Sequence, residues 1–341
     1  MGTRSKRSNG AESVLRAAVS ALRVYLELAK FRLSGMVLLT TAVGFVLAPH
    51  GPSAGTTLLW ALLGTALSAA GANTLNQLLE IDRDRLMERT RARPLPSGQI
   101  SRAGALATGL GSIIAGLAVL AAGTNMLTTA LSALVIVLYV LVYTPMKLHS
   151  SLNTLVGAVC GAIPPMMGWT AASNQIGFGA LLLGCILFLW QIPHFFALAW
   201  LYRDDYRRAG FRMLPLVDPR GRLSGRIALV HTLALVPLGA GAWAAGFAGQ
   251  YFLVGSIALS LAFSYCGWEL LRWASRAAAR RLFLASLVYL PFLLGLMVAD
   301  RTRPEPGFSE RTIVALASSH DAGELTAVPF HRSSRRGPTD R

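Results

Sequence analysis

Long apolar runs separated by short polar segments cover most of this 341-residue chain. A helix that crosses a bilayer needs roughly 18 or more predominantly apolar residues. Nine candidate runs lie near Leu33–Ala48, Thr57–Leu79, Ala103–Ala122, Leu127–Tyr143, Leu152–Ala172, Ile176–Leu198, Ile227–Gly246, Tyr251–Leu271 and Arg281–Ala299. The first run is short, and the other eight are long enough. The pattern predicts an all-α integral membrane protein with about nine transmembrane helices.

The two ends of the chain do not share this pattern. Residues 1–12 are polar and basic, and residues 301–341 are rich in Ser, Pro, Gly and Arg without a sustained apolar period. Segments of such composition cannot bury enough apolar surface to offset the entropy of folding. We therefore expect a disordered N-terminus, a membrane domain over residues 13–300 and a disordered C-terminal tail.

Composition and charge support the membrane assignment. The chain is 53% hydrophobic and only 14% charged, whereas soluble domains carry about 25% charged residues. The net charge of +16 could suggest a nucleic-acid partner, but the basic residues alternate from loop to loop. The short turns near residues 50–56, 123–126, 171–175 and 247–250 contain none. The positive-inside rule then predicts a multi-pass protein of the cell membrane with its N-terminus and charged loops in the cytoplasm, and no nucleic-acid partner.

Polar side chains gather where the second predicted helix ends. At about 100° per residue, one helical face holds two amides and two carboxylates: Asn73, Asn76, Glu80 and Asp84. Such a stripe is costly in a membrane and by default indicates function. Carboxylate and amide oxygens suit Mg²⁺, which proteins commonly hold together with substrate phosphates. Neighbouring arginines, Arg93 among them, can bind the same phosphates. The alternative is a solvated loop whose arginines only set topology.

A second charged group follows the sixth predicted helix. If this helix continues past Pro193, then His194, Asp205 and Arg208 share one face within about 60°. Asp205, or its neighbour Asp204, could then complete a second metal–diphosphate site opposite the first. A lone histidine in a helix is usually hydrogen-bonded in the core, but the nearby carboxylates favour a functional His194.

The loop between these two groups contains Tyr143 and Lys147. Lys147 is the only strong charge of this loop. It either enforces orientation or reaches a leaving diphosphate, and Tyr143 is a candidate substrate contact beside it. Tyr202 and Tyr206 are typical of the aromatic belt at a membrane interface.

The N-x-x-x-E-x-x-x-D pattern resembles the first aspartate-rich motif of the UbiA superfamily of intramembrane prenyltransferases. Further similar segments occur in order, over roughly Lys30 to Asp300: Met87–Leu95, Gly98–Ser101, Tyr143–Lys147, Asn153–Gly157, Ile163–Trp169, Trp190–Phe195 and Asp204–Pro215. Two features depart from the superfamily. Glu80 stands where many members have Asp, and the second motif lacks a full D-x-x-x-D because Tyr202 and Tyr206 flank its acid pair, which weakens a two-metal picture of that site.

The resemblance implies a UbiA-type helical bundle around a central cavity open to the lipid. It implies transfer of the farnesyl group of farnesyl diphosphate to a vinyl group of haem b, with addition of water, to give haem O for terminal oxidases. Mg²⁺ would be the cofactor. Haem A synthase or oxidase assembly proteins are candidate protein partners.

The resemblance also assigns roles to the residues found above. The metal ligands and catalytic residues would be Asn76, Glu80, Asp84 and Asp205. The substrate-binding residues would be Asn73, Arg93, Tyr143, Lys147, His194 and Arg208. A separate hypothesis is that His194 ligates the haem iron or shapes its pocket. Two alternatives stay open. Another prenyltransferase of the superfamily would act on a quinone precursor or chlorophyllide. A transporter would usually place its polar residues near the midplane rather than at one face.

Overall fold

The computed structural model describes residue 16, residues 19–51 and residues 54–302. The predicted disordered ends, residues 1–12 and 301–341, lie outside this part of the chain, apart from Arg301 and Thr302. The described residues are helical, joined by turns and one isolated β-bridge between Ala248 and Arg301.

Eight helices within the described residues are long and apolar enough to cross a membrane. They are α3 (Ala54–Leu79), α5 (Arg102–Gly123), a continuous helix over Met126–His149, α8 (Asn153–Ser173), α9 (Phe178–Leu201), α12 (Arg222–Ala244), α13 (Gln250–Trp273) and α14 (Arg276–Ala299). A ninth span results if the helix Val19–Leu28 and α2 (Phe31–Leu47), which meet at a bend of 63°, count as one. The predicted all-α membrane protein with about nine spans is confirmed, with a broken helix as its first span.

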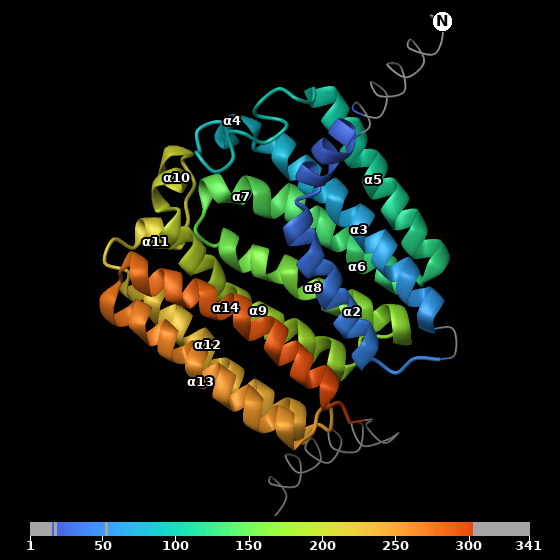
Figure 1. Ribbon diagram of the computed structural model, residues 1–341, viewed down its shortest axis with the longest axis vertical. Helices are drawn as coiled ribbons and strands as arrows, with labels where there is room; N and C mark the ends of the chain where they lie inside the picture. The colour runs from blue at the N-terminus through green and yellow to red at the C-terminus, as the bar shows by residue number, and fades with distance from the viewer. Residues whose placement is uncertain (1–15, 17–18, 52–53, 303–341) are drawn as a thin grey trace, which may run out of the picture. The chain divides into compact units, whose positions relative to one another are not determined.

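Shorter helices complete the chain. The Met126–His149 helix consists of α6 (Met126–Val137), a π-helical segment η1 (Leu138–Tyr143) and α7 (Thr144–His149). Three short helices lie in the loops: α4 (Ile81–Asp84), α10 (Arg203–Arg208) and α11 (Leu214–Val217). These three loop helices cluster at one end of the bundle (Figure 1).

Helices α8 and α9 form the centre of the bundle. In their most apolar stretches, 67% of α8 and 61% of α9 is buried, against 22% of the Met126–His149 helix. Helices α12 and α14 pack on α9, whereas α2 packs on α8 (Figure 1). Pro164, Pro165 and Pro193 lie inside these two central helices without ending them. All three prolines are buried, and packed neighbouring helices tolerate proline in membrane helices.

Glycines let α3 and α5 approach closely. A Cβ atom at Gly116 would lie only 2.8 Å from the carbonyl oxygen of Gly64, and one at Gly71 would lie 2.5 Å from the carbonyl oxygen of Gly109. Gly64 and Gly71 lie seven residues apart on α3, and Gly109 and Gly116 lie seven residues apart on α5. Each helix therefore presents its two glycines on one face. Small residues at such contacts are typical of membrane helices, which associate through close packing.

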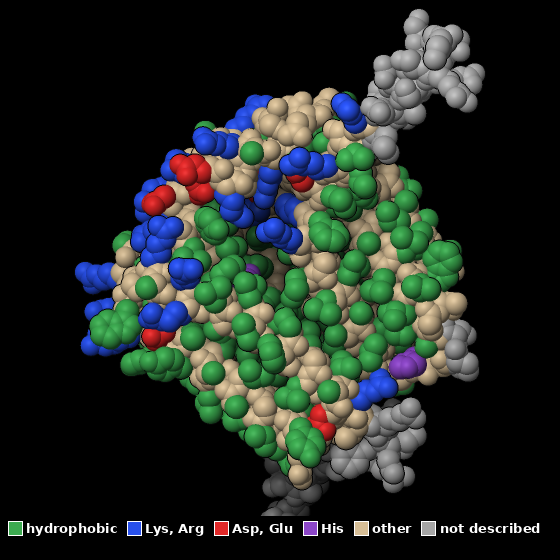
Figure 2. Space-filling view, viewed as in Figure 1, with side chains coloured by type: hydrophobic (Ala, Val, Ile, Leu, Met, Phe, Trp, Pro, Cys, Tyr) green, Lys and Arg blue, Asp and Glu red, His purple; other side chains and the backbone are tan. Residues whose placement is uncertain are grey.

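The surface divides into an apolar flank and a charged end. Figure 2 shows hydrophobic side chains over the sides of the helices, while lysine, arginine and acidic side chains gather around α4, α10 and α11. A hollow opens beside this charged end, on the flank of the bundle. This division fits a bilayer around the helices and an aqueous phase at the charged loops.

Candidate active site

A cavity of about 970 Å³ occupies the bundle below the charged end. Its walls come from the Val19–Leu28 helix, α2, α3, η1, α8 and α9, and from the loops around α4 and α10. Most of the lining is apolar, including Leu33, Val37 and Phe195. Charged side chains from the broken first span, the loop around α4 and α7 cover one end. The cavity is therefore amphipathic, with an ionic mouth and a hydrocarbon interior.

The first polar stripe continues past the end of helix α3. Helix α3 ends at Leu79, but the Glu80 N–H still donates to the Asn76 carbonyl oxygen at 3.0 Å, and the Asp84 N–H donates to the Glu80 carbonyl oxygen at 2.7 Å. These bonds continue the helical ladder into α4. As a result Asn73, Glu80 and Asp84 all line the cavity.

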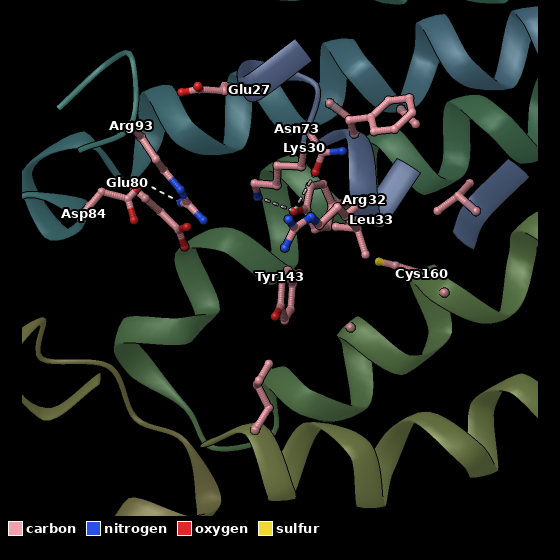
Figure 3. Close-up of a pocket in the computed structure, with 18 of the residues that line it drawn as sticks. Glu27, Lys30, Arg32, Leu33, Asn73, Glu80, Asp84, Arg93, Tyr143 and Cys160 are labelled. Atoms are coloured by element: carbon pink, nitrogen blue, oxygen red, sulfur yellow. Dashed lines mark hydrogen bonds and ion pairs between the residues drawn. The ribbon is translucent and has the colours of Figure 1, made fainter. Parts of the chain in front are cut away.

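Each of the two carboxylates lies against a cation. Glu80 accepts from Lys147 Nζ at 2.7 Å, and Asp84 accepts from Arg93 Nη1 at 2.8 Å. The carboxylate side chains are only 8% and 1% exposed. Figure 3 shows Arg93 next to Asp84 and Glu80 on one side of the cavity. Buried charges persist when they are paired, so the stripe and the predicted cations form one ionic cluster.

Asn76 lies behind the cavity wall. Its amide Nδ2 donates to Thr144 Oγ1 at 2.9 Å, and its Oδ1 accepts from Lys30 Nζ at 2.6 Å. Asn76 is fully buried and is not among the lining residues. Lys30 itself lines the cavity, so this amide reaches the ionic mouth through the lysine.

Sequence reasoning missed Lys30 and Tyr139. Lys30 stands in the turn between the two halves of the broken first span, with a left-handed φ of 49°. Its Nζ donates to Tyr139 Oη at 3.2 Å, and that hydroxyl donates to Asn73 Oδ1 at 3.2 Å. In the sequence, Lys30 is one of several basic residues before the first predicted span, and it was given no role in the site. Its position just before the first apolar run, which starts at Leu33, was the available signal.

The π-helical segment η1 contributes two tyrosines to the cavity wall. Thr144 Oγ1 donates to the Tyr139 carbonyl oxygen, five residues earlier, at 2.7 Å. The rings of Tyr139 and Tyr143 stack at 5.6 Å, and Lys147 lies 4.6 Å from the centre of the Tyr143 ring. π-Helical turns are frequent at functional sites. Here the wide turn brings both tyrosines to the cavity, including the predicted Tyr143.

The second predicted group is divided by a helix break. Helix α9 continues past Pro193, but it ends at Leu201, and the separate helix α10 begins at Arg203 after the non-helical Tyr202. Asp205 pairs with Arg208 and accepts from the Glu88 backbone N–H at 3.3 Å. Neither Asp205 nor Arg208 is among the lining residues, whereas His194 is. The three do not share one cavity face, because the single-helix assumption fails at Tyr202.

Tyr206, the residue after Asp205, lines the cavity, whereas Asp205 does not. The guanidinium of Arg89 lies 4.9 Å from the ring centre of Tyr202 and 5.9 Å from that of Tyr206. These two tyrosines, assigned from the sequence to the interface, thus also hold an arginine at the cavity mouth. Among the described residues, no group of three or more His, Cys, Asp or Glu side chains could by itself hold a metal ion.

Residues 37–302 match the UbiA prenyltransferase family. The chain is 38% identical over 289 residues to the protoheme IX farnesyltransferase of Solibacter usitatus, covering 82% of this chain and 99% of that one. It is 43% identical over 281 residues to the human mitochondrial protoheme IX farnesyltransferase, covering 82% of this chain and 62% of the human one. The fold resembles a UbiA homolog of Archaeoglobus fulgidus bound to GPP and Mg²⁺, with a TM-score of 0.60 and 17% identity over 80% of this chain and 99% of that chain.

Proposed function

This chain belongs to the UbiA prenyltransferase family, and we propose that it transfers the farnesyl group of farnesyl diphosphate to a vinyl group of haem b. The observation that carries this function is the 38% identity to a protoheme IX farnesyltransferase along 99% of that relative's length. In the reaction the allylic C–O bond breaks and a C–C bond forms to the vinyl group. Water then adds its oxygen to the haem side and releases a proton, which gives haem O and diphosphate.

The ionic mouth suits the departing diphosphate. Lys30, Arg93 and Lys147 all line the cavity at this end. Lysine and arginine side chains form charge-assisted hydrogen bonds to phosphate oxygens. Such preorganised cations stabilise charge that develops on the leaving group, and this lowers the barrier to an allylic cation. Asn76 supports the cluster by accepting from Lys30 Nζ.

The residues at the mouth also fit Mg²⁺. Asp84 Oδ1 is buried and has no hydrogen-bond partner among the described residues, although Oδ2 of the same carboxylate is paired with Arg93. An unpaired buried oxygen is costly, and a bound cation would satisfy it. Glu80 lies in the same cluster, so Glu80 and Asp84 would hold the ion, with Asn73 lining the cavity beside them. Mg²⁺ there would neutralise charge on the diphosphate.

The roles assigned to Asn76 and Asp205 as metal ligands stay predictions. The Asn76 oxygen accepts from Lys30, and the Asp205 carboxylate is engaged by Arg208 and the Glu88 N–H. We propose that Asp205 and Arg208 hold the loop after α4 against α10. This loop carries Arg89 and Arg93, so the contact would position two arginines of the mouth.

The apolar interior suits the other two requirements of the reaction. A volume of about 970 Å³ lies at the upper end of the range of roughly 300–1,000 Å³ for ligand pockets, as a prenyl chain and a macrocycle together would need. Leu33 and Phe31 line the cavity yet are 50% and 68% exposed, so an apolar substrate could enter from the lipid. Apolar walls also keep water from the cation until the C–C bond has formed.

The protein is a multi-pass membrane protein of this family. We propose that it lies in the cell membrane with the ionic mouth on the cytoplasmic side, because the basic loops gather at that end. Haem A synthase or oxidase assembly proteins remain candidate partners that would receive haem O.

Incubation of the purified enzyme with haem b, farnesyl diphosphate and Mg²⁺ tests the function. Mass spectrometry of the extracted pigments should find haem O only when both substrates are present. Prenylation of a quinone precursor or chlorophyllide, with no product from haem b, would refute haem as the acceptor and leave the family assignment intact.

A further inference from the structure

His194 is fixed inside the cavity by a residue from another helix. Its Nδ1 atom lies 2.7 Å from the Oγ atom of Ser286 on α14. The imidazole ring stacks on Trp190 with centroids 5.1 Å apart, and Phe283 lies 5.1 Å away on a tilted ring plane. His194 is the only histidine among the described residues that line the cavity. The ring is therefore held in one orientation at the wall of the reaction chamber.

The hydrogen bonds of Ser286 determine which histidine nitrogen carries the proton. Ser286 Oγ lies 2.6 Å from the carbonyl oxygen of Phe283, to which it donates. A hydroxyl has one proton, and a carbonyl oxygen has none. Ser286 can consequently only accept from His194, so Nδ1 carries the N–H. In neutral imidazole the other nitrogen then has a free lone pair. No described residue makes a hydrogen bond to this Nε2 atom.

The serine is itself held from two sides. Its side chain is fully buried, and its backbone carbonyl oxygen accepts from Trp190 Nε1 at 2.8 Å. The same residue of α14 thus fixes both the histidine and the tryptophan that stacks on it. An ionisable side chain held inside a membrane bundle in this way is by default a candidate functional residue.

We propose that His194 Nε2 ligates the iron of haem b, and that Ser286 is a positioning residue that holds His194 in the Nδ1–H form. This rests on the proposed function, with haem b as the substrate. Histidines that bind metals generally donate their second N–H to an oxygen acceptor, which fixes the tautomer and strengthens the ligand. Neutral imidazole is a common axial ligand of haem iron. Ligation would hold the macrocycle in place while its vinyl group reacts.

Two porphyrins separate iron ligation from simple packing. The full-length enzyme is titrated with ferric haem b, followed by absorption, and with metal-free protoporphyrin IX, followed by fluorescence. His194→Ala should remove the histidine-ligated haem spectrum and weaken haem binding by at least about tenfold, while the affinity for metal-free protoporphyrin stays at the wild-type value. Added imidazole should restore the haem spectrum of His194→Gly.

Three serine variants test the positioning role. Ser286→Ala should weaken haem binding by about tenfold, within the range of 10–100-fold for loss of a ligand's hydrogen-bond partner. Ser286→Thr keeps the hydroxyl and should restore the spectrum. Ser260→Ala is the matched control, since Ser260 is a fully buried serine of α13 that bonds to Tyr289 Oη at 3.0 Å and does not line the cavity. It should bind haem as the wild type does.

An equal loss of both porphyrins in His194→Ala would overturn the proposal, because it would mean that the ring only shapes the pocket. An unchanged haem spectrum in that variant would overturn it as well. If Ser286→Ala binds haem normally while His194→Ala does not, the positioning role is refuted. Failure of the proposed function is separate: the wild type would then form no haem O, whereas the binding titrations still decide whether His194 ligates iron.

Discussion

The substitution Asp84→Asn isolates the charge of the most buried carboxylate at the cavity mouth. Asn has nearly the same shape as Asp, so the cavity keeps its form. The change removes one negative charge 2.8 Å from the Arg93 guanidinium and converts the unpartnered Oδ1 side into a neutral amide. We expect the variant to fold and its turnover to fall sharply.

Two terms set the size of the effect. At an effective dielectric constant of about 20, two charges 2.8 Å apart attract by about 6 kcal/mol before desolvation is counted. The Arg93 side chain is 25% exposed, so hydration of the freed guanidinium offsets much of the loss. For catalysis, removal of one preorganised electrostatic group costs about 10²–10³ in kcat, or roughly 3–4 kcal/mol. Catalysis should therefore suffer more than stability.

Asp82→Asn is the control from the same short helix. Asp82 is 69% exposed, pairs with Arg85 and Arg102, and does not line the cavity. Exposed ion pairs contribute about 0–1 kcal/mol, so this variant should retain nearly full activity. The assay measures kcat for haem O formation and the Mg²⁺ concentration for half-maximal rate, with thermal melting in detergent as the folding check. Equal kcat values in the two variants, with both folded, would refute a metal–diphosphate role for Asp84.

The other predictions concern the ionic cluster and the helix contacts. Lys147→Met should lower the free energy of unfolding by about 3–5 kcal/mol, because it leaves Glu80 unpaired and buried. The double variant Lys147→Met/Glu80→Gln should regain thermal stability but no turnover. Regained turnover would contradict a role of this pair at the diphosphate. Lys30→Met should lower kcat/KM for farnesyl diphosphate by about tenfold or more, the value of a hydrogen bond to a charged group, and an unchanged kcat/KM would remove Lys30 from the mouth. Gly116→Leu should melt at a lower temperature, because its Cβ would lie 2.8 Å from the Gly64 carbonyl oxygen and overpacking costs about 1–3 kcal/mol or more; an unchanged melting temperature would show that α3 and α5 can separate freely.

Local pattern was sufficient to predict the spans and the first polar stripe. Length and hydropathy define a membrane helix, because every backbone group in hydrocarbon must be bonded within its own segment. The stripe was predictable because the hydrogen-bond ladder continues from Asn76 through Glu80 to Asp84. Lys147 and Arg93 were recognised as cations that could meet it, although the sequence left open whether Lys147 serves only orientation.

Prediction failed where a helix ended unexpectedly. His194 and Asp205 would share one face in a single helix, but the break at Tyr202 turns Asp205 toward the Glu88 N–H. A periodicity argument assumes constant rotation per residue, and nothing in the local apolar pattern marked the point where that rotation stops.

Sequence pattern was therefore enough to predict the membrane class, about nine spans, the family and the polar face that begins on α3. Which polar and charged side chains meet depends on how the helices pack in three dimensions. Lys30 bonds to Asn76, 46 residues away, and Ser286 bonds to His194, 92 residues away. Such pairs depend on how separate helices pack, and helix packing is set by the shapes of whole faces rather than by the spacing of residues along one chain segment.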